Sequence, residues 1–265
     1  MSTPVVLLAI DGRGVATVTF NRPEVNNAYN GELLQGVLAG LDRIERDPKV
    51  RAVVLKGNGR HFQAGADLKW VNGVRTEGRV QNLAASAMTA EVIDRLNRLA
   101  VPVVAQVQGG CFGGGTGVIA ACDVVIAADN AIFSIAEVRW GLHPGIIIPQ
   151  LNDAISVRQV RRYALTGERF GAAEARRIGL VHEVVPLDGL EARGDAIVAQ
   201  ILENGSAAMA KTKGHILESA WGGLDRAAMD ALITSHAEAR QSAEAAEGLA
   251  SFAEKRDAAW APTKG

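Results

Sequence analysis

The sequence contains very little cysteine, which limits the chemistry it can carry. Cys111 and Cys122 are its only thiols, and their spacing of eleven residues matches no zinc-binding pattern. Because the cysteines and histidines do not cluster along the chain, we expect no metal and no redox cofactor. Cys111 stands among glycines and is a candidate nucleophile, but a small apolar core residue is the favoured interpretation. Two cysteines without a secretory signal predict a reducing, cytoplasmic setting.

An excess of charge of either sign is also missing. The net charge is −1 at pH 7 and the pI is about 6.5, whereas nucleic-acid-binding proteins usually carry a basic stripe. The arginine-rich stretch at residues 158–162 is short, and with Glu168 nearby it is typical of a solvated helix face. We therefore expect no nucleic-acid partner.

Long apolar runs are absent as well. No uncharged apolar run reaches about 18 residues, so we expect no transmembrane helix and no membrane partner. Residues 1–4 (MSTP) have neither a basic segment nor a long apolar one, so no export signal is expected. Apolar residues make up 48% of the sequence and charged residues 22%, which is ordinary for a soluble domain with a sizeable core.

Strands and helices are predicted in alternation over the first half. Residues 5–10 and 15–20 are β-rich, and the Asp-Gly-Arg-Gly between them predicts a hairpin. Asn30 is expected to cap a helix that runs to about residue 47 with apolar residues on one face. The elements predicted next are a strand at 53–56, a helix at 79–99 and a strand at 103–107.

A glycine-rich segment divides this half from a helical one. Six glycines lie between residues 109 and 117, and short strands are predicted beyond them at 124–127 and 132–135. From about residue 149 onward the pattern is almost all helical, which predicts an α/β body followed by a helical C-terminal part. The predicted helices are 155–165, 172–178, 189–203, 207–220, 225–240 and 242–257.

One interpretation of the glycines is a dinucleotide site. Residues 115–120 (GTGVIA) fit the G-x-G-x-x-A pattern after a strand. However, the next strand begins near Val124, which leaves barely two helical turns. The first acidic residue beyond that strand, Asp129, is 14 positions past Gly115, where about 20 is expected. A P-loop is excluded because no Gly-Lys-Ser/Thr follows, and a turn that lets a helix pack closely is the structural alternative.

A third interpretation fits better. Three successive glycines before a helix let the backbone approach a ligand, and the exposed N–H groups favour a developing negative charge. An enolate or oxyanion requires such donors. Such an oxyanion hole needs two N–H donors, and the glycine segment supplies only one. The small-residue segment 62–68 (FQAGADL) is a candidate for the second donor.

At this point several motifs resemble a known family, the crotonase or enoyl-CoA hydratase/isomerase superfamily. Residues 21–28 (NRPEVNNA) resemble its N-terminal signature, and residues 62–69 (FQAGADLK) resemble its F-x-A-G-A-D-L segment. The central signature is matched by residues 107–144 and a C-terminal one by residues 252–256 (FAEKR). Linked motifs in the right order over nearly the whole chain are far more specific than any one of them.

This resemblance implies a spiral of ββα units over residues 1–200 and a helical oligomerisation region over residues 201–265. It implies a homotrimer or a dimer of trimers, and acyl-CoA thioester substrates, with coenzyme A part of the substrate. The implied oxyanion donors are the backbone N–H groups of Ala66 and Gly114. Residues implied to bind coenzyme A are Val25, Ala64, Ala66, Asp67 and Leu68, with Lys69 and Lys255 as phosphate partners, the latter from a neighbouring subunit, unless these lysines are simply solvent-exposed.

The sequence departs from this family at one catalytic position. Its hydratases typically use two glutamates, and Glu137 matches the second, whereas Gly117 stands where the first is expected. A single carboxylate can take a proton from water and return one to C2, or move a proton from C2 to C4 as an isomerase does. The structural alternative is that Glu137 only forms a salt bridge with Arg139.

Residues 133–142 and 163–170 most resemble a branch that hydrates branched glutaconyl-CoA thioesters, such as 3-methylglutaconyl-CoA in leucine breakdown and isohexenylglutaconyl-CoA in acyclic terpene breakdown. Members of this branch also tend to lack the first glutamate. The resemblance implies a distal carboxylate on the substrate, which Arg139 or His143 would bind. Gly117 is expected to contact the substrate as well. The alternative for His143 is an ordinary loop histidine. Two alternatives stay open: a Δ3,Δ2-enoyl-CoA isomerase, and a catalytically silent acyl-CoA-binding or RNA-binding relative.

Overall fold

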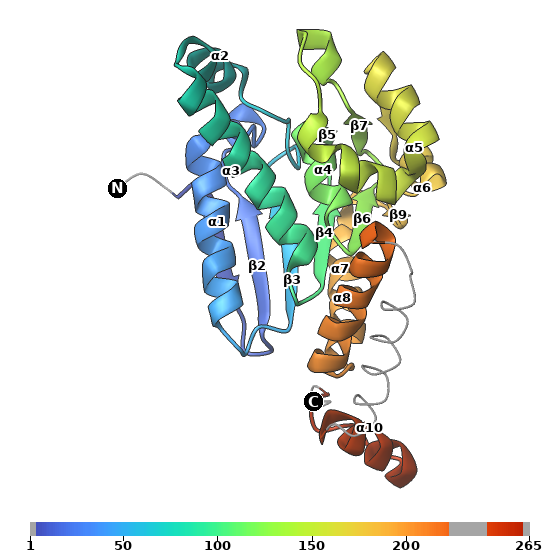
Figure 1. The fold of residues 1–265 in the computed structure, drawn as a ribbon. Helices are drawn as coiled ribbons and strands as arrows, with labels where there is room; N and C mark the ends of the chain where they lie inside the picture. The colour runs from blue at the N-terminus through green and yellow to red at the C-terminus, as the bar shows by residue number, and fades with distance from the viewer. Residues whose placement is uncertain (1–3, 223–242, 262–265) are drawn as a thin grey trace.

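The computed structural model describes residues 4–222 and 243–261, which form an α/β fold around two sheets (Figure 1). The larger sheet has the order β1-β2-β3-β4-β6-β9, and all its pairs are parallel except the β1–β2 hairpin. Its strands are β1 (Val6–Ile10), β2 (Val15–Phe20), β3 (Ala52–Gly57), β4 (Val103–Val107), β6 (Val124–Ala128) and β9 (Glu183–Val185). The smaller sheet contains β5 (Gly110–Phe112), β7 (Ile132–Ser134) and β8 (Phe170–Gly171).

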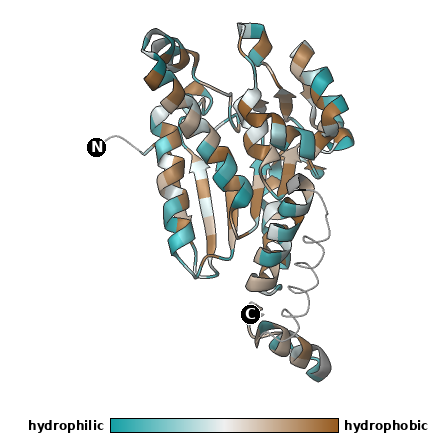
Figure 2. Cartoon of the chain, in the orientation of Figure 1, coloured by the Kyte–Doolittle hydropathy of each residue, from teal (hydrophilic) through white to brown (hydrophobic). Residues whose placement is uncertain are grey.

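The large sheet is covered on both faces. Helices α1 (Gly31–Arg46) and α3 (Arg79–Arg98) pack on one face, and α7 (Leu190–Leu202) packs on the other. In β3, Val53 and Leu55 belong to the core under α1 and α3, while Val54 belongs to the core under α7. Because alternate residues of a strand point to opposite faces, this burial explains the continuous apolar runs of the inner strands, which Figure 2 shows between helices with polar outer faces.

The predicted hairpin and the first helix are confirmed. The Asp11 carboxylate accepts the N–H groups of Arg13 and Val15 and so closes the β1–β2 turn. Helix α1 begins where expected, because the Asn30 side chain accepts the N–H of Leu33 at 3.0 Å.

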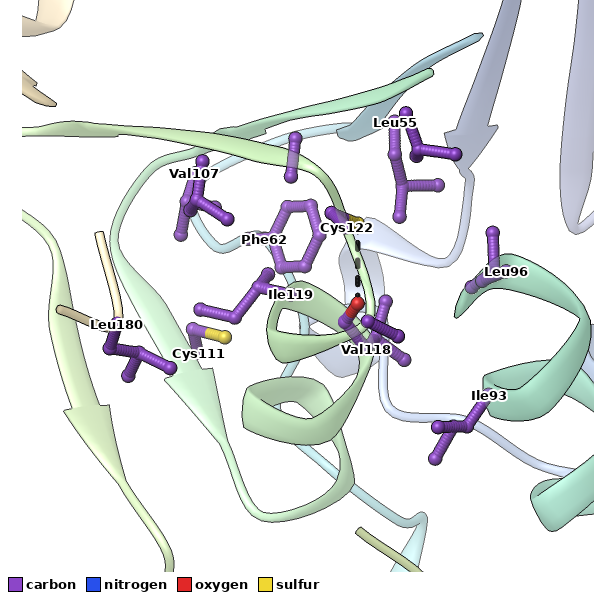
Figure 3. Packing of buried hydrophobic residues seen from close by; sticks show 14 of the residues in the cluster. Leu55, Phe62, Ile93, Leu96, Val107, Cys111, Val118, Ile119, Cys122 and Leu180 are labelled. Carbon is purple, nitrogen blue, oxygen red and sulfur yellow. Dashed lines mark hydrogen bonds between the residues drawn. The ribbon is translucent and has the colours of Figure 1, made fainter. Parts of the chain in front are cut away.

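Both cysteines are core residues. Figure 3 shows them among apolar side chains around Phe62 and Ile119, with the Cys122 thiol donating to the Val118 carbonyl at 3.2 Å. Burial raises the pKa of both thiols, so neither is activated as a nucleophile. The favoured interpretation of Cys111 is therefore confirmed.

The helical C-terminal region is present, and hydrogen bonds connect it to the α/β body. Helix α8 (Ser206–Gly222) follows α7, and α10 (Ala243–Glu254) lies farthest from the sheet (Figure 1). The Arg51 guanidinium donates to the carbonyls of Leu202, Asn204 and Trp260. The predicted helix at 225–240 lies outside the described residues. No helix within the described part of the chain is long and apolar enough to cross a membrane.

Five helices and strands differ from the sequence-based expectation. Strands β5, β8 and β9 and helix α2 (Leu68–Thr76) are additional. The three strands have only two or three residues each, too few to show a period, and they form through pairing with distant strands. Helix α5 (Ile148–Thr166) begins seven residues before the predicted start and is kinked at Ser156, which has a φ of 67°. The helix predicted at 155–165 is its second half.

Candidate active site

The site is a cavity of about 900 Å³ within the size range of small-molecule sites. Its walls come from α2, the first half of α3, the glycine turn that follows β5, and the loop that runs from β7 to α5. Most of the lining is apolar or glycine, and Glu137 is the only acidic side chain among the described residues that line it. A cavity of this character suits a mainly apolar ligand with a few polar groups.

The three glycines at 113–115 bring the site together, because each lets a different side chain approach. A Cβ on Gly113 would lie 3.0 Å from Oε1 of Glu137. A Cβ on Gly114 would lie 2.7 Å from Cε1 of Tyr29, and a Cβ on Gly115 would lie 2.6 Å from Oε1 of Gln63. Real Cβ atoms do not tolerate contacts of 2.6–2.7 Å. The first glycine also has a φ of 50°, which disfavours any other residue.

Backbone pairing places the second predicted donor segment beside this turn. A Cβ on Gly65 would lie 2.9 Å from the carbonyl oxygen of Phe112, and Tyr29 pairs with Ala66 through hydrogen bonds of 2.8 Å on either side. Within residues 4–222 and 243–261, neither the N–H of Ala66 nor that of Gly114 has a protein acceptor. An oxyanion hole needs two N–H groups that are free to donate, and the assignment of these two donors stays a prediction.

Glu137 is half-buried, and one of its two carboxylate oxygens is buried without a hydrogen-bond partner among the residues that the structure describes. It begins the short 3-10 helix η2 (Glu137–Trp140), and no described residue hydrogen-bonds its buried Oε2. Burial raises its pKa, against a smaller lowering by its own backbone N–H, and a carboxylate with a raised pKa is a stronger base. The alternative of a salt bridge with Arg139 is not what the structure shows, because Nε of Arg139 donates to the Gly167 carbonyl at 2.9 Å.

Position 117 does not form part of the cavity wall. A Cβ on Gly117 would lie 2.1 Å from Cγ2 and 2.5 Å from Cβ of Ile147, and it is Ile147 that lines the cavity. The glycine therefore makes room for an isoleucine from another segment, η3 (Gly145–Ile147), and not for the ligand. Gly117 is therefore not among the residues that line the cavity, and its contact with substrate stays a prediction.

Several basic side chains line the cavity. Arg139 and His143 line the cavity as expected, and they are joined by Arg75 and Arg169. The Arg169 guanidinium lies over the Phe112 ring, 5.4 Å from its centroid. No carboxylate among the described residues pairs with Arg139 or Arg169. Sequence reasoning missed Arg169 because no local pattern separates it from the nearby solvated arginines.

The predicted coenzyme A residues divide into two groups. Ala64, Ala66 and Leu68 line the cavity. Val25, Asp67, Lys69 and Lys255 are not part of its wall. Asp67 instead caps α2 by accepting the N–H of Lys69 at 3.0 Å and pairs with Arg22 at 3.3 Å. Lys255 lies beyond α10 and is exposed, so any contact it makes with a ligand in this cavity would require a neighbouring subunit, as the resemblance implies.

Tyr29 is a second residue that sequence reasoning missed. Its ring lines the cavity and meets Trp70 edge to face, with ring centroids 6.0 Å apart. Burial, and to a smaller extent the charge of Glu137, raises the pKa of Tyr29 to about 12. The only sequence signal is its position, directly after the signature at 21–28 and before the N-cap at Asn30.

The described residues contain no group of three or more His, Cys, Asp or Glu side chains that could hold a metal ion. The polar groups that line the cavity include the Glu137 carboxylate, backbone N–H groups and the guanidinium groups of three arginines. These elements suit proton transfer next to a carbonyl group whose oxygen becomes negatively charged.

Comparisons with known proteins agree with this arrangement. A short-chain-enoyl-CoA hydratase of Clostridium acetobutylicum is 36% identical over 211 residues, which cover 78% of this chain and 79% of that protein. The structure of an enoyl-CoA hydratase from Shewanella pealeana matches with a TM-score of 0.92 at 32% identity and covers 97% of this chain and 96% of that one. Pseudomonas aeruginosa AtuE matches with a TM-score of 0.93 at 35% identity, over 97% and 100%.

The predicted fold class is confirmed by these structures, which share the α/β body and the helical C-terminal region. The enoyl-CoA hydratase/isomerase family itself matches residues 11–263, nearly the whole chain. With this match and relatives above 30% identity, the chain belongs to the enoyl-CoA hydratase/isomerase family.

Proposed function

We propose that this enzyme hydrates the 2,3-double bond of a branched enoyl-CoA thioester of the glutaconyl type, with 3-methylglutaconyl- or isohexenylglutaconyl-CoA as its substrate. The observation that carries the proposal is the pair Arg139 and Arg169, which line the same cavity as Glu137 without a carboxylate partner among the described residues. A guanidinium recognises a carboxylate through two parallel hydrogen bonds. A substrate with a distal carboxylate would supply that missing partner.

The reaction then follows from three groups. The thioester oxygen accepts the N–H groups of Ala66 and Gly114, which makes C3 electrophilic. Glu137 takes a proton from a water molecule as the water oxygen bonds to C3, and the double-bond electrons move onto the thioester oxygen as an enolate. The enolate collapses and C2 takes the proton back from Glu137, so the carboxylate is regenerated and the water has added to one face.

A second candidate, a Δ3,Δ2-enoyl-CoA isomerase, is favoured by one observation. Glu137 is the only carboxylate among the described residues lining the cavity. Ile147 fills the space beside Gly117, the position where the family's hydratases typically carry the first of their two glutamates. An isomerase needs one base that removes a proton at one carbon and delivers it at another. The enolate and its two donors would be the same as in hydration.

The proposal includes a homotrimer or a dimer of trimers. The C-terminal helices expose large apolar side chains, Ile216 at 62% and Leu249 at 67%, which a subunit interface would cover. In such an assembly Lys255 would reach the coenzyme A phosphates of a neighbouring subunit. Sedimentation equilibrium of the full chain tests this part, and a monomer at micromolar concentration would contradict it.

Turnover assays with crotonyl-, 3-methylglutaconyl-, isohexenylglutaconyl- and trans-3-hexenoyl-CoA test the substrate and reaction class. We expect the highest kcat/KM for a glutaconyl thioester. Arg139→Gln and Arg169→Gln should lower that value by about 10–10²-fold, as expected for loss of a charged hydrogen bond worth about 1.5–3 kcal/mol, without a matching loss on crotonyl-CoA.

Arg158→Gln is the matched control, because Arg158 is an exposed arginine that does not line the cavity. It should leave every rate unchanged. A preference for crotonyl-CoA with no selective effect of either cavity arginine would overturn the substrate class. Turnover of trans-3-hexenoyl-CoA alone would identify the isomerase.

A further inference from the structure

We propose that Tyr29 is a further catalytic residue, whose hydroxyl donates a third hydrogen bond to the enolate oxygen held by the N–H groups of Ala66 and Gly114. The inference rests on the enolate chemistry of the proposed function and is independent of the acyl chain. Tyr29 is the residue that touches both halves of the predicted hole: its backbone pairs with Ala66, and its ring lies on Gly114.

The ring is held in place from several sides. The backbone N–H of Tyr29 donates to the Gly65 carbonyl at 2.8 Å, and its own carbonyl accepts the N–H of Asp67 at 2.8 Å. Trp70 contacts the ring edge to face. A side chain restrained in this way can hold a donor in position before the substrate binds, so little reorganisation is needed as charge develops.

The hydroxyl lies where a donor is needed. A Cβ on Gly114 would be 3.1 Å from Oη of Tyr29, which places the hydroxyl beside the residue whose N–H is one of the two predicted donors. Tyr29 lines the cavity, and no protein group within the described ranges hydrogen-bonds its hydroxyl. The hydroxyl is therefore free to donate a hydrogen bond to a thioester oxygen in the cavity.

The protonation state of the Tyr29 phenol supports its role as a hydrogen-bond donor. Because burial and the charge of Glu137 raise the pKa of Tyr29 to about 12, the phenol stays protonated between pH 6 and 9 and can donate throughout this range. The carboxylate that disfavours a phenolate is also the base that creates the enolate. The two groups therefore have separate tasks, one accepting a proton and the other only donating a hydrogen bond.

Two reactions that need no particular acyl chain test the proposal. The first is hydration of crotonyl-CoA. The second is exchange of the C2 hydrogens of butyryl-CoA with D₂O, in which Glu137 removes a proton from C2, the enolate forms, and C2 takes up a deuteron. Exchange is followed by mass spectrometry and reports enolate stability without any addition of water.

Tyr29→Phe removes the hydroxyl and keeps the ring against Gly114 and Trp70. We expect both rates to fall by about 10–10³-fold, the range seen when one oxyanion donor is lost, while the dissociation constant of butyryl-CoA, measured by calorimetry, changes by less than about threefold. The loss should be the same from pH 6 to 9. Tyr163→Phe is the matched control, since Tyr163 is the only other tyrosine and its hydroxyl bonds to Glu174 outside the cavity.

Rates of Tyr29→Phe within about threefold of the wild type, or an equal loss in Tyr163→Phe, would overturn the proposal. A Tyr29→Phe protein with a lowered melting temperature and a proportionally weaker affinity for butyryl-CoA would also overturn it, because the ring would then be a structural element. Failure of the acyl-chain proposal leaves the exchange of butyryl-CoA untouched, so the two failures are distinguishable.

Discussion

Ile147 occupies the space beside Gly117, with its Cγ2 2.1 Å from the position where a Cβ on the glycine would stand. Gly117 is buried within α4 (Gly114–Ala120), whereas Ile147 comes from η3 and lines the cavity, so the contact packs α4 against a segment of the cavity wall. In this chain the position where the family's hydratases typically carry a glutamate is thus packed tightly against an isoleucine. A glutamate at 117 would have no room while the isoleucine stays.

Gly117→Glu should therefore lower stability and activity on every substrate, branched or not. Overpacking of a core typically costs about 1–3 kcal/mol, and the new carboxylate would also be buried. The double variant Gly117→Glu/Ile147→Gly should recover part of the stability, because both colliding atoms, Cγ2 and Cβ of Ile147, are gone. Urea unfolding and a double-mutant cycle measure the coupling; additive effects of the two substitutions would contradict the contact.

Glu137→Gln should abolish both turnover and hydrogen exchange while acyl-CoA binding stays near normal, because no other carboxylate among the described residues lines the cavity. The wild-type rate should fall on the acidic side with an apparent pKa above 4.5, since burial raises the pKa of Glu137. Initial rates from pH 4.5 to 9 and calorimetry of butyryl-CoA measure these effects. Activity of the variant within a few-fold of the wild type would exclude Glu137 as the base.

Glu137→Gln should raise the stability of the fold although it abolishes activity. A carboxyl whose folded-state pKa is raised destabilises the fold at a pH above that pKa and has no effect below the unfolded-state value. Glu137→Gln should therefore unfold at a higher temperature than the wild type at pH 8, and the difference should shrink as the pH falls toward 4.5. A melting temperature that is lower than the wild type at pH 8 would contradict the unpaired, buried state of Glu137.

The N–H of Gly114 can be tested with a pair of variants. Both Gly114→Ala and Gly114→Pro add a Cβ against Tyr29, but only proline removes the N–H. The predicted donor role implies that the proline variant loses about 10²–10³-fold more kcat than the alanine variant. Circular dichroism must show both to be folded. Equal losses would place the oxyanion hole elsewhere and leave only the crowding of Tyr29.

His61 should make the fold sensitive to acid. Its Nδ1 accepts the N–H of Gly110 at 2.7 Å, and burial, together with the charge of Arg60, lowers its pKa. Because the folded pKa lies below the unfolded value of about 6.5, the neutral ring stabilises the fold above pH 6.5, and this stability is lost as the pH falls. Melting temperatures from pH 7.5 to 5 should decline in the wild type and in the control His143→Ala. The decline should be smaller in His61→Ala, and an identical decline in all three proteins would contradict the prediction.

Local sequence determined the elements whose causes are local. The hairpin follows from the turn residues at 11–14, and α1 from the capping side chain of Asn30 and one apolar face. The position of Glu137 and the glycine turn could also be predicted, because they belong to linked motifs. Strand β9 could not, since its three residues become a strand only by pairing with β6.

Tertiary structure alone decided which side chains meet in the site. Tyr29, Ile147 and Arg169 stand in segments far from the residues they meet, Gly114, Gly117 and Phe112. Nothing in a single sequence reports that an isoleucine fills the space beside one glycine or that a tyrosine ring covers another. Such contacts arise when the chain folds back on itself. Close packing then fixes which side chain fills each gap, because a protein interior leaves few voids.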